Sequence, residues 1–397
     1  MGETVVDRVA SRFHAAAVHL GGATEVVTGV RLTGAVPDAE DVAAWLDRHP
    51  MLAARPRSLD GYLTLVSQRS PRPVVRDEPL RLGPAPVEPL DAAVRRELEL
   101  PLAGRLWRLT VLPSHDGDTT LLWRRDHLVS DATTTDQLLA DLLENARGGR
   151  HLHPRSWFAP GLDQDRPRYA GAAGPQGTRL VSLTWHREAA CAVDRLRAAE
   201  GVSVSALLAG ALVEAGDFPT GSRAWVAYSR RKALGENRTG CFIGVRGTRV
   251  DREESLLRLA ADCHREAVEA SRSTEVTYER YADSVRAVLD DRDADLGPCV
   301  TNSGAYPRTA RLEDVDDVMT CVDRRHGNYS LVAHVDRFRG RLRTTLVAPR
   351  HRTTQQQLEE LAVRLVNTAG HPSAGHDAGH DAGAGAEGTA SPVREGA

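Results

Sequence analysis

The chain has 397 residues, of which 41% are hydrophobic, enough for two ordinary domains or one large two-lobed unit. The formal net charge is −3, because 51 Lys and Arg residues nearly balance 54 Asp and Glu residues. This balance argues against a nucleic acid or another polyanion as the partner.

The five cysteines lie far apart and form no CxxC pair, which argues against a zinc ribbon or a dithiol redox site. The opening segment MGETVVDRVASRF carries acidic residues and has no uninterrupted apolar stretch, so we expect no signal peptide. No run is long and apolar enough to predict a membrane span. We therefore predict a cytoplasmic protein with reduced thiols, no membrane contact and no metal site.

In the first half of the chain, hydrophobic periodicity predicts alternating helices and strands. Val6, Ala10, Phe13 and Ala17 recur at helical spacing and predict an opening amphipathic helix. The further elements are a strand at 25–32, a helix from an Asp38 N-cap to Pro50, strands at 62–66, 107–112 and 119–123, and a helix that carries Leu138, Leu139, Leu142 and Leu143.

Residues 154–177 are rich in Pro and Gly, lack periodicity and predict a linker. The second half then predicts a strand at 179–185, helices near 187–200 and 203–216, a strand at 224–229, helices near 253–271 and 276–290, strands near 298–302, 315–323, 328–336 and 341–348, and a last helix capped by Thr353 or Thr354. The low-complexity end is expected to be disordered.

Both halves mix helices with strands, so two α/β lobes are the natural interpretation. We place the amino-terminal lobe at 1–160, the linker at 161–178, the carboxy-terminal lobe at 179–370 and a disordered tail at 371–397.

The stretch WRRDHLVSDA (123–132) joins a predicted strand to a predicted helix and holds His127 and Asp131 four residues apart. Histidine titrates near neutrality and can take a proton from a nucleophile. Without further evidence, a surface or core histidine is the commoner case, and Asp131 is also a suitable N-cap for the helix that follows. Ser130 lies close by, but no GxSxG elbow surrounds it, which argues against a serine hydrolase.

Several stretches, taken in order, resemble the condensation-domain superfamily, which includes chloramphenicol acetyltransferase, nonribosomal peptide condensation domains and polyketide-associated acyltransferases. The signature HHxxxDG of that superfamily is similar to DHLVSDA at 126–132. The other similar stretches are LTGAVPDAEDVAAWLDRHPMLAARPR (32–57), LWRLTVLPSHDGDTTLLWRRDH (106–127), WVAYSRR (225–231), FIGVRGTRV (242–250) and VTNSG (300–304). Together they span most of residues 1–370.

The resemblance implies an α/β fold of two chloramphenicol-acetyltransferase-like lobes that form a V-shaped cleft with a central tunnel. It implies an acyltransferase of specialised metabolism, such as antibiotic biosynthesis. Because the sequence shows no adjoining carrier or adenylation segment, we expect the enzyme to act freestanding. An acyl or aminoacyl group would move from a thioester, on CoA or a carrier protein, to a hydroxyl or amine of a small-molecule acceptor. No cofactor is expected beyond the CoA or phosphopantetheine thioester that acts as co-substrate.

For the site, the resemblance implies that His127 is the general base. It implies that Asp131 supports the loop by pairing with an arginine of the second lobe, Arg230 or Arg231. Asn302 and Ser303 lie on a predicted strand that could face the cleft, and we expect them to contact substrate.

The motif departs from the superfamily pattern at both ends. Asp126 replaces the first histidine, and a carboxylate beside His127 would raise its pKa or disturb its tautomer. Ala132 replaces the closing glycine, and its methyl group would clash if the backbone needs a positive φ, or would narrow the tunnel. These departures motivate one alternative, a non-catalytic binding or recruitment protein. A second alternative is a different reaction in the same tunnel, by a cyclase, dehydratase or hydrolase.

Overall fold

The computed structural model describes most of the chain. The described residues are 3–67, 74–77, 88–102, 105–114, 117–146, 154–159, 177–216, 218, 221–251, 254–326 and 328–370. Residues 160–176 of the predicted linker and the predicted tail beyond residue 370 lie outside them.

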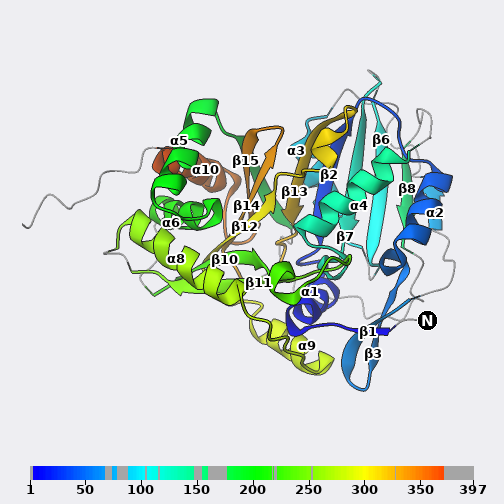
Figure 1. Ribbon diagram of the computed structural model, residues 1–397, viewed down its shortest axis with the longest axis horizontal. Coiled ribbons are helices and arrows are strands. Elements are labelled where there is room, and N and C mark those ends of the chain that lie inside the picture. Colours follow the sequence, from blue (N-terminus) through cyan, green and yellow to red (C-terminus); the bar gives the residue numbers. More distant parts are fainter. Residues whose placement is uncertain are drawn as a thin grey trace, which may run out of the picture.

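Two six-stranded sheets organise these residues, and a three-stranded sheet adjoins them (Figure 1). The first sheet has the order β13 (Val315–Val322), β2 (Val26–Leu32), β7 (Thr119–Arg125), β6 (Trp107–Pro113), β8 (Arg155–Phe158) and β5 (Val74–Asp77). The second has the order β11 (Ile243–Arg249), β10 (Arg223–Ser229), β12 (Pro298–Gly304), β14 (Leu331–Phe338), β15 (Arg341–Pro349) and β9 (Thr178–Thr184). The small sheet has the order β1 (Glu3–Val5), β4 (Tyr62–Val66) and β3 (Arg55–Leu59).

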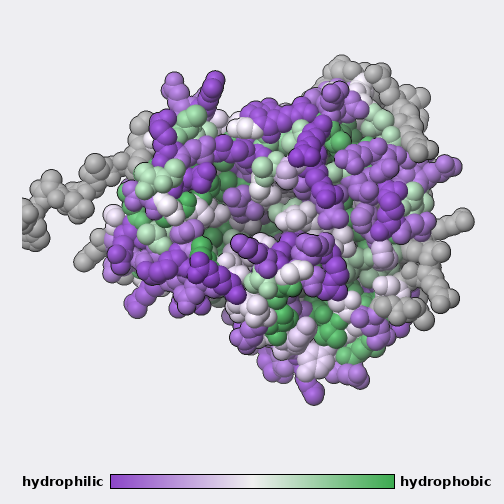
Figure 2. All heavy atoms as spheres, in the orientation of Figure 1, coloured by the Kyte–Doolittle hydropathy of each residue, from purple (hydrophilic) through white to green (hydrophobic). Residues whose placement is uncertain are grey.

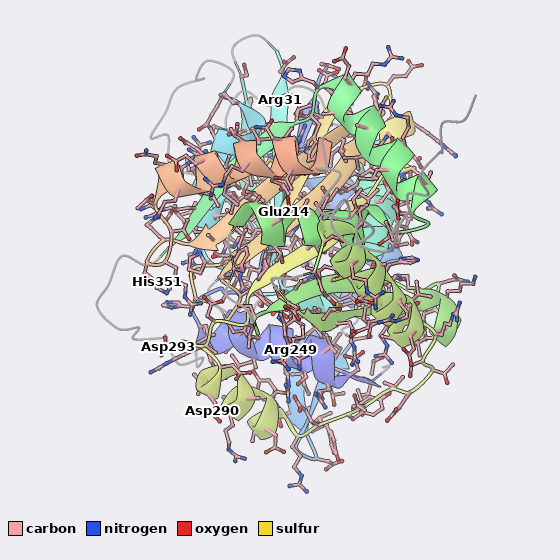
Figure 3. All side chains as sticks on the ribbon, turned by 90° about the vertical axis from the view of Figure 1, so that its left-hand side faces the viewer. Arg31, Glu214, Arg249, Asp290, Asp293 and His351 are labelled. Carbon is pink, nitrogen blue, oxygen red and sulfur yellow. The ribbon has the colours of Figure 1, made fainter. Side chains whose placement is uncertain are left out.

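Helices cover both large sheets. They are α1 (Arg8–His19), α2 (Ala39–Arg48), α3 (Leu90–Leu98), α4 (Ala132–Glu144), α5 (Arg187–Ala199), α6 (Val204–Gly216), α7 (Arg231–Leu234), α8 (Leu256–Ser271), α9 (Tyr281–Asp290) and α10 (Gln355–Gly370). Short 3-10 turns are η1 (Pro50–Ala53), η2 (His127–Val129) and η3 (Thr309–Arg311). Figure 3 shows α10 and α6, the helix that carries Glu214, in front of the second sheet, whereas α4 lies over the first sheet in Figure 1. The predicted mixed α/β class is therefore confirmed.

Strand β13 comes from the second half of the chain but belongs to the first sheet. It pairs antiparallel with β2, from Val315 opposite Leu32 to Val322 opposite Val26. The next strand, β14, returns to the second sheet between β12 and β15. The residues between β13 and β14 therefore pass from one large sheet to the other.

Two predictions about secondary structure are wrong. The expected linker begins with a strand, β8, whose Trp157 is fully buried in the first sheet, so tertiary packing overrides the Pro- and Gly-rich composition. The helix expected from residue 276 begins only at Tyr281. Before it, the carbonyl of Thr277 accepts from the amide of Arg8, and the amide of Tyr281 donates to the carbonyl of Gly61. These backbone groups are therefore hydrogen-bonded to segments beside the small sheet.

Each large sheet has its own hydrophobic core. In the first core, the Trp45 ring meets Trp107 and Trp123 edge-on, with ring centroids 5.8 and 5.6 Å apart. In the second core, α6 is apolar on almost every side and packs between the sheet and helices α8 and α10. Hydrophilic residues cover most of the face seen in Figure 2, and hydrophobic residues show in smaller patches among them.

Within the described ranges, no single helix is long and apolar enough to cross a membrane. The consecutive helices α5 and α6 pass the length and composition test only as a pair, which is bent by 110°.

Asp336 on β14 is a buried carboxylate, 1% exposed, and neither of its oxygens has a hydrogen-bond partner among the described residues. Burial raises its pKa from 3.8 to about 7. Because the folded pKa exceeds the unfolded value, protonation stabilises the fold at low pH, and this stabilisation is lost as the pH rises through about 7.

We therefore expect Asp336→Asn to raise the free energy of unfolding at about pH 8 by roughly 1–3 kcal/mol, and to flatten its dependence on pH. Urea unfolding at about pH 5 and pH 8 measures both effects. The control is Asp290→Asn on α9, an exposed position labelled in Figure 3, which should change neither. A variant that is less stable than wild type at the higher pH would contradict the expectation.

Candidate functional site

A cavity of about 300 Å³ lies where the motif loop and the start of α4 meet strands β10, β12, β13 and β14. The predicted site residues that line it are His127, Ser130, Asp131, Ala132, Asn302 and Ser303. Asp126 and Arg230 do not line it.

Two aspartates fix the motif loop after β7. Asp126 is the N-cap of η2, and its Oδ1 accepts from the amide of Leu128 at 3.0 Å. Asp131 is the N-cap of α4, and its Oδ1 accepts from the amide of Thr134 at 2.9 Å. His127 lies between these caps, so the loop that carries it is held at both ends.

The ring of His127 lies in the cavity wall. Phe13 of α1 stacks on it, with ring centroids 4.8 Å apart and an interplanar angle of 16°. The Sγ of Cys241 lies 3.5 Å from Nδ1. Burial lowers the pKa of His127, and the nearby Arg125 acts in the same direction. A hydrogen bond of the ring to its own backbone, together with Asp131 and Asp126, acts in the opposite direction but does not outweigh burial. The ring is therefore a neutral imidazole near neutral pH. Asp126 does act to raise the pKa of His127, as expected, but burial outweighs its effect.

The carboxylate of Asp126 is turned toward α1. Its Oδ2 lies 2.5 Å from Nδ1 of His14, and both side chains are almost fully buried. Phe13 and His14, which are adjacent on α1, thus contact His127 and Asp126. The residue that replaces the first histidine of the superfamily signature therefore anchors the loop to α1.

Asp131 forms a bidentate ion pair with Arg231. Nε of Arg231 donates to Oδ2 at 2.8 Å, and Nη2 donates to Oδ1 at 2.9 Å. The amide of Phe242 also donates to Oδ2, at 3.2 Å. Asp131 is thus both the N-cap of α4 and an ion-pair partner, and it ties the motif loop to the segment after β10.

Of the two arginines that the sequence left open, Arg231 is the partner of Asp131, and Arg230 is not. Nη1 of Arg230 lies 3.7 Å from Oδ2 of Asp7, and Nη2 donates to the carbonyl of Glu275. The side chains of Arg230 and Arg231 therefore point to different neighbours. Arg230 supports the site only indirectly, through its contact with Asp7 at the start of α1.

Ser130 is fully buried, and its hydroxyl is a hydrogen-bond partner of Arg125. Its hydroxyl accepts from Nε of Arg125 and lies 3.2 Å from Oγ1 of Thr135. Arg125 also donates to Thr28 at 2.9 Å and to Thr135 at 2.7 Å. In the described part of the chain no hydrogen bond joins Ser130 to His127, so a serine–histidine nucleophile is not assembled.

Ala132 is the first residue of α4 and does not have a positive φ. The backbone at Ala132 is therefore unstrained, and the clash expected for a positive φ does not occur. The methyl group lines the cavity instead.

Sequence reasoning missed several residues of the cavity region. Phe13, His14 and Cys241 reach the motif only through tertiary contacts, so no local pattern could reveal them. Arg324 and His334 also line the cavity. A signal existed for His334, because it interrupts the apolar pattern of LVAHVDRF (331–338) on the same strand face as Asp336.

Among the described residues, no group of three or more His, Cys, Asp or Glu side chains is placed to hold a metal ion. The expected absence of a metal and of a cofactor stays a prediction.

No protein-family model and no curated protein matches the sequence. Solved structures do match along nearly the whole chain. TRI3 trichothecene 15-O-acetyltransferase from Fusarium sporotrichioides has a TM-score of 0.65 at 12% identity, covering 93% of this chain and 95% of that one. The condensation domain from the monacolin K polyketide synthase MokA has a TM-score of 0.61 at 10% identity, covering 93% and 97%.

The first condensation domain of the CDA synthetase has a TM-score of 0.59 at 15% identity, covering 92% of this chain and 95% of that one. At these identities the likeness concerns the fold and carries no activity or substrate with it. The chain therefore has the mixed α/β fold that condensation domains share with this acetyltransferase, as the resemblance in its sequence implied.

Proposed function

We propose that the protein is a condensation-like acyltransferase of specialised metabolism. It transfers an acyl or aminoacyl group from a CoA or carrier-protein thioester to a hydroxyl or amine of a small acceptor. The observation that carries the proposal is a neutral His127 in the wall of a cavity of about 300 Å³, on a loop fixed at both ends.

In the proposed reaction, the neutral imidazole of His127 takes the proton from the acceptor hydroxyl or amine. The acceptor oxygen or nitrogen attacks the thioester carbonyl carbon and forms a tetrahedral intermediate. The intermediate collapses, the carbon–sulfur bond breaks, and the imidazolium returns its proton to the leaving thiolate. General base catalysis of this kind contributes about 10²- to 10⁴-fold to the rate.

The surrounding residues support this role without touching the proton. The lowered pKa of His127 keeps the base unprotonated at neutral pH. The Asp131–Arg231 pair holds the loop, and Phe13 fixes the plane of the ring. Asn302 and Ser303 lie in the cavity wall, where we propose that they contact substrate.

The test is a comparison of metabolites by mass spectrometry. The gene is deleted in its host and restored as wild type, as His127→Ala or as His186→Ala. His186 is exposed and makes no capping hydrogen bond at the start of α5, so it is the matched control. We expect wild type and the control to restore the final metabolite, which should exceed the accumulated intermediate by the mass of an acyl group.

Other outcomes would replace the proposal. A product lighter than its precursor by one water would identify a cyclase or dehydratase in the same cavity. Restoration by His127→Ala, at equal protein abundance, would favour a binding or recruitment role.

A further inference from the structure

Arg324 and His334 form a second polar group in the cavity, which the proposed reaction does not use. Both line the cavity, and they are 3% and 4% exposed. Arg324 follows β13, where the chain crosses between the large sheets, and His334 lies on β14. Within the residues that the structure describes, Nε and Nη2 of Arg324 and Nδ1 of His334 are buried and have no hydrogen-bond partner.

The tautomer of His334 follows from one contact. The backbone amide of Val322 donates to Nε2 at 3.0 Å, and a backbone amide can only donate. Nε2 is therefore unprotonated, and the neutral ring carries its proton on Nδ1. Burial lowers the pKa of His334 to about 3, so the ring stays neutral at any ordinary working pH. His334 thus offers a buried N–H donor.

Arg324 is a permanent cation that lacks a carboxylate partner among the described residues. The adjacent Asp323 is occupied, since Arg124, Arg325 and Thr178 all donate to its carboxylate. The guanidinium lies 5.2 Å from the ring centroid of Tyr329, which offers only a cation–π contact. The charged or titratable groups nearest to it otherwise are Cys299, Arg352 and His334, and none supplies a negative charge at neutral pH.

The acidic residues of the cavity wall do not compensate Arg324 either. Asp131 is paired with Arg231. Asp136 accepts from the amides of Arg308 and Thr309 at 3.0 and 2.9 Å. The cavity therefore presents positive charge without an available counter-charge, and a buried cation is costly unless it is paired.

We propose that the cavity binds a substrate with a carboxylate, which pairs with Arg324 and accepts a hydrogen bond from Nδ1–H of His334. A planar guanidinium matches the two oxygens of a carboxylate. The carboxylate site names a substrate class for the proposed acyltransferase. Calling the bound molecule a substrate rests on the proposed function, whereas the binding itself does not. The carboxylate belongs either to the transferred acyl group or to the acceptor.

The test measures binding and needs no turnover. Hexanoate and hexanamide, which have the same chain length and differ in charge, are titrated into the purified full chain and followed by ligand-observed NMR. We expect wild type to bind hexanoate at least about tenfold more tightly than hexanamide. Arg324→Met should abolish this preference, and Arg324→Lys should retain part of it. The preference should be constant between about pH 6 and pH 9, because the guanidinium stays charged.

Arg246→Met is the matched control, because the side chain of Arg246 is 57% exposed and pairs with Glu266 outside the cavity. It should keep the preference for hexanoate. Equal binding of hexanoate and hexanamide by wild type would overturn the proposal. So would a preference that survives in Arg324→Met, since the anion would then bind another group of the cavity wall, such as His127 or Arg125.

A second pair of probes separates the two sources of the carboxylate. If the acyl group carries it, glutaryl-CoA should bind more tightly than pentanoyl-CoA, and Arg324→Met should remove the difference. If the acceptor carries it, only the hexanoate preference should depend on Arg324. A failure of the proposed function, seen as full complementation by His127→Ala, leaves these binding results untouched, so the two failures are distinguishable.

Discussion

His127→Ala should lower the rate of acyl transfer by about 10²- to 10⁴-fold while the protein stays folded. The substitution removes the proposed base and its stacking with Phe13, but it leaves both caps of the loop and the Asp131–Arg231 pair in place. The rate is measured on the substrates that the complementation experiment identifies, with His186→Ala as control. A loss below about tenfold, with circular dichroism unchanged, would contradict the assignment.

The same base predicts a distinct pH profile. His127 must be neutral to accept a proton, and burial together with Arg125 lowers its pKa below 6.5. Activity should therefore persist at pH values below 6.5, and it should fall only as the pH drops through the lowered pKa. An acid limb of kcat/KM that lies above pH 6.5 would show that the burial of the ring does not govern its titration.

The sequence predicted the elements that carry strong periodicity or clear caps. The Asp38 cap of α2 forms a full capping box, and α6, β7 and β15 lie within a few residues of their expected bounds. Strand β8 was missed, because its burial depends on β6 and β5 as neighbours. The composition of residues 154–159 does not indicate which strands will lie beside them.

At the site, the superfamily resemblance pointed to His127 and Asp131, and both line one cavity. It left the choice between Arg230 and Arg231 open, because a spacing of one residue cannot tell which side chain faces the loop. The departure at Asp126 suggested a raised pKa for His127, and Asp126 does act in that direction, although burial outweighs it. The structure gives Asp126 a different partner, His14, which lies 112 positions away in the chain. Contacts at such a distance depend on the packed fold and on no local pattern.

Breaking the Asp131–Arg231 ion pair should lower the free energy of unfolding strongly. The two side chains are 3% and 11% exposed, so removing one partner leaves a charge that water cannot solvate well. We expect Arg231→Met to lower the free energy of unfolding by about 3–5 kcal/mol. Asp131→Asn should cost somewhat less, because asparagine remains a good N-cap for α4 and its carbonyl oxygen can still accept from Thr134. Its amide nitrogen, however, can no longer accept from Arg231 and Phe242 as Oδ2 does.

A double-mutant cycle separates the ion pair from the other contacts of both residues. In Asp131→Asn/Arg231→Met neither charge is left unpaired, so the double variant should lose less than the sum of the single variants, by about 1–3 kcal/mol in urea unfolding. The exposed pair Arg286–Asp283 on α9 is the control and should show a coupling below about 1 kcal/mol. Additive losses at Asp131 and Arg231 would mean that the N-cap and the packing on Phe242 hold the loop. In that case the tie between the motif and the segment after β10 would not be electrostatic.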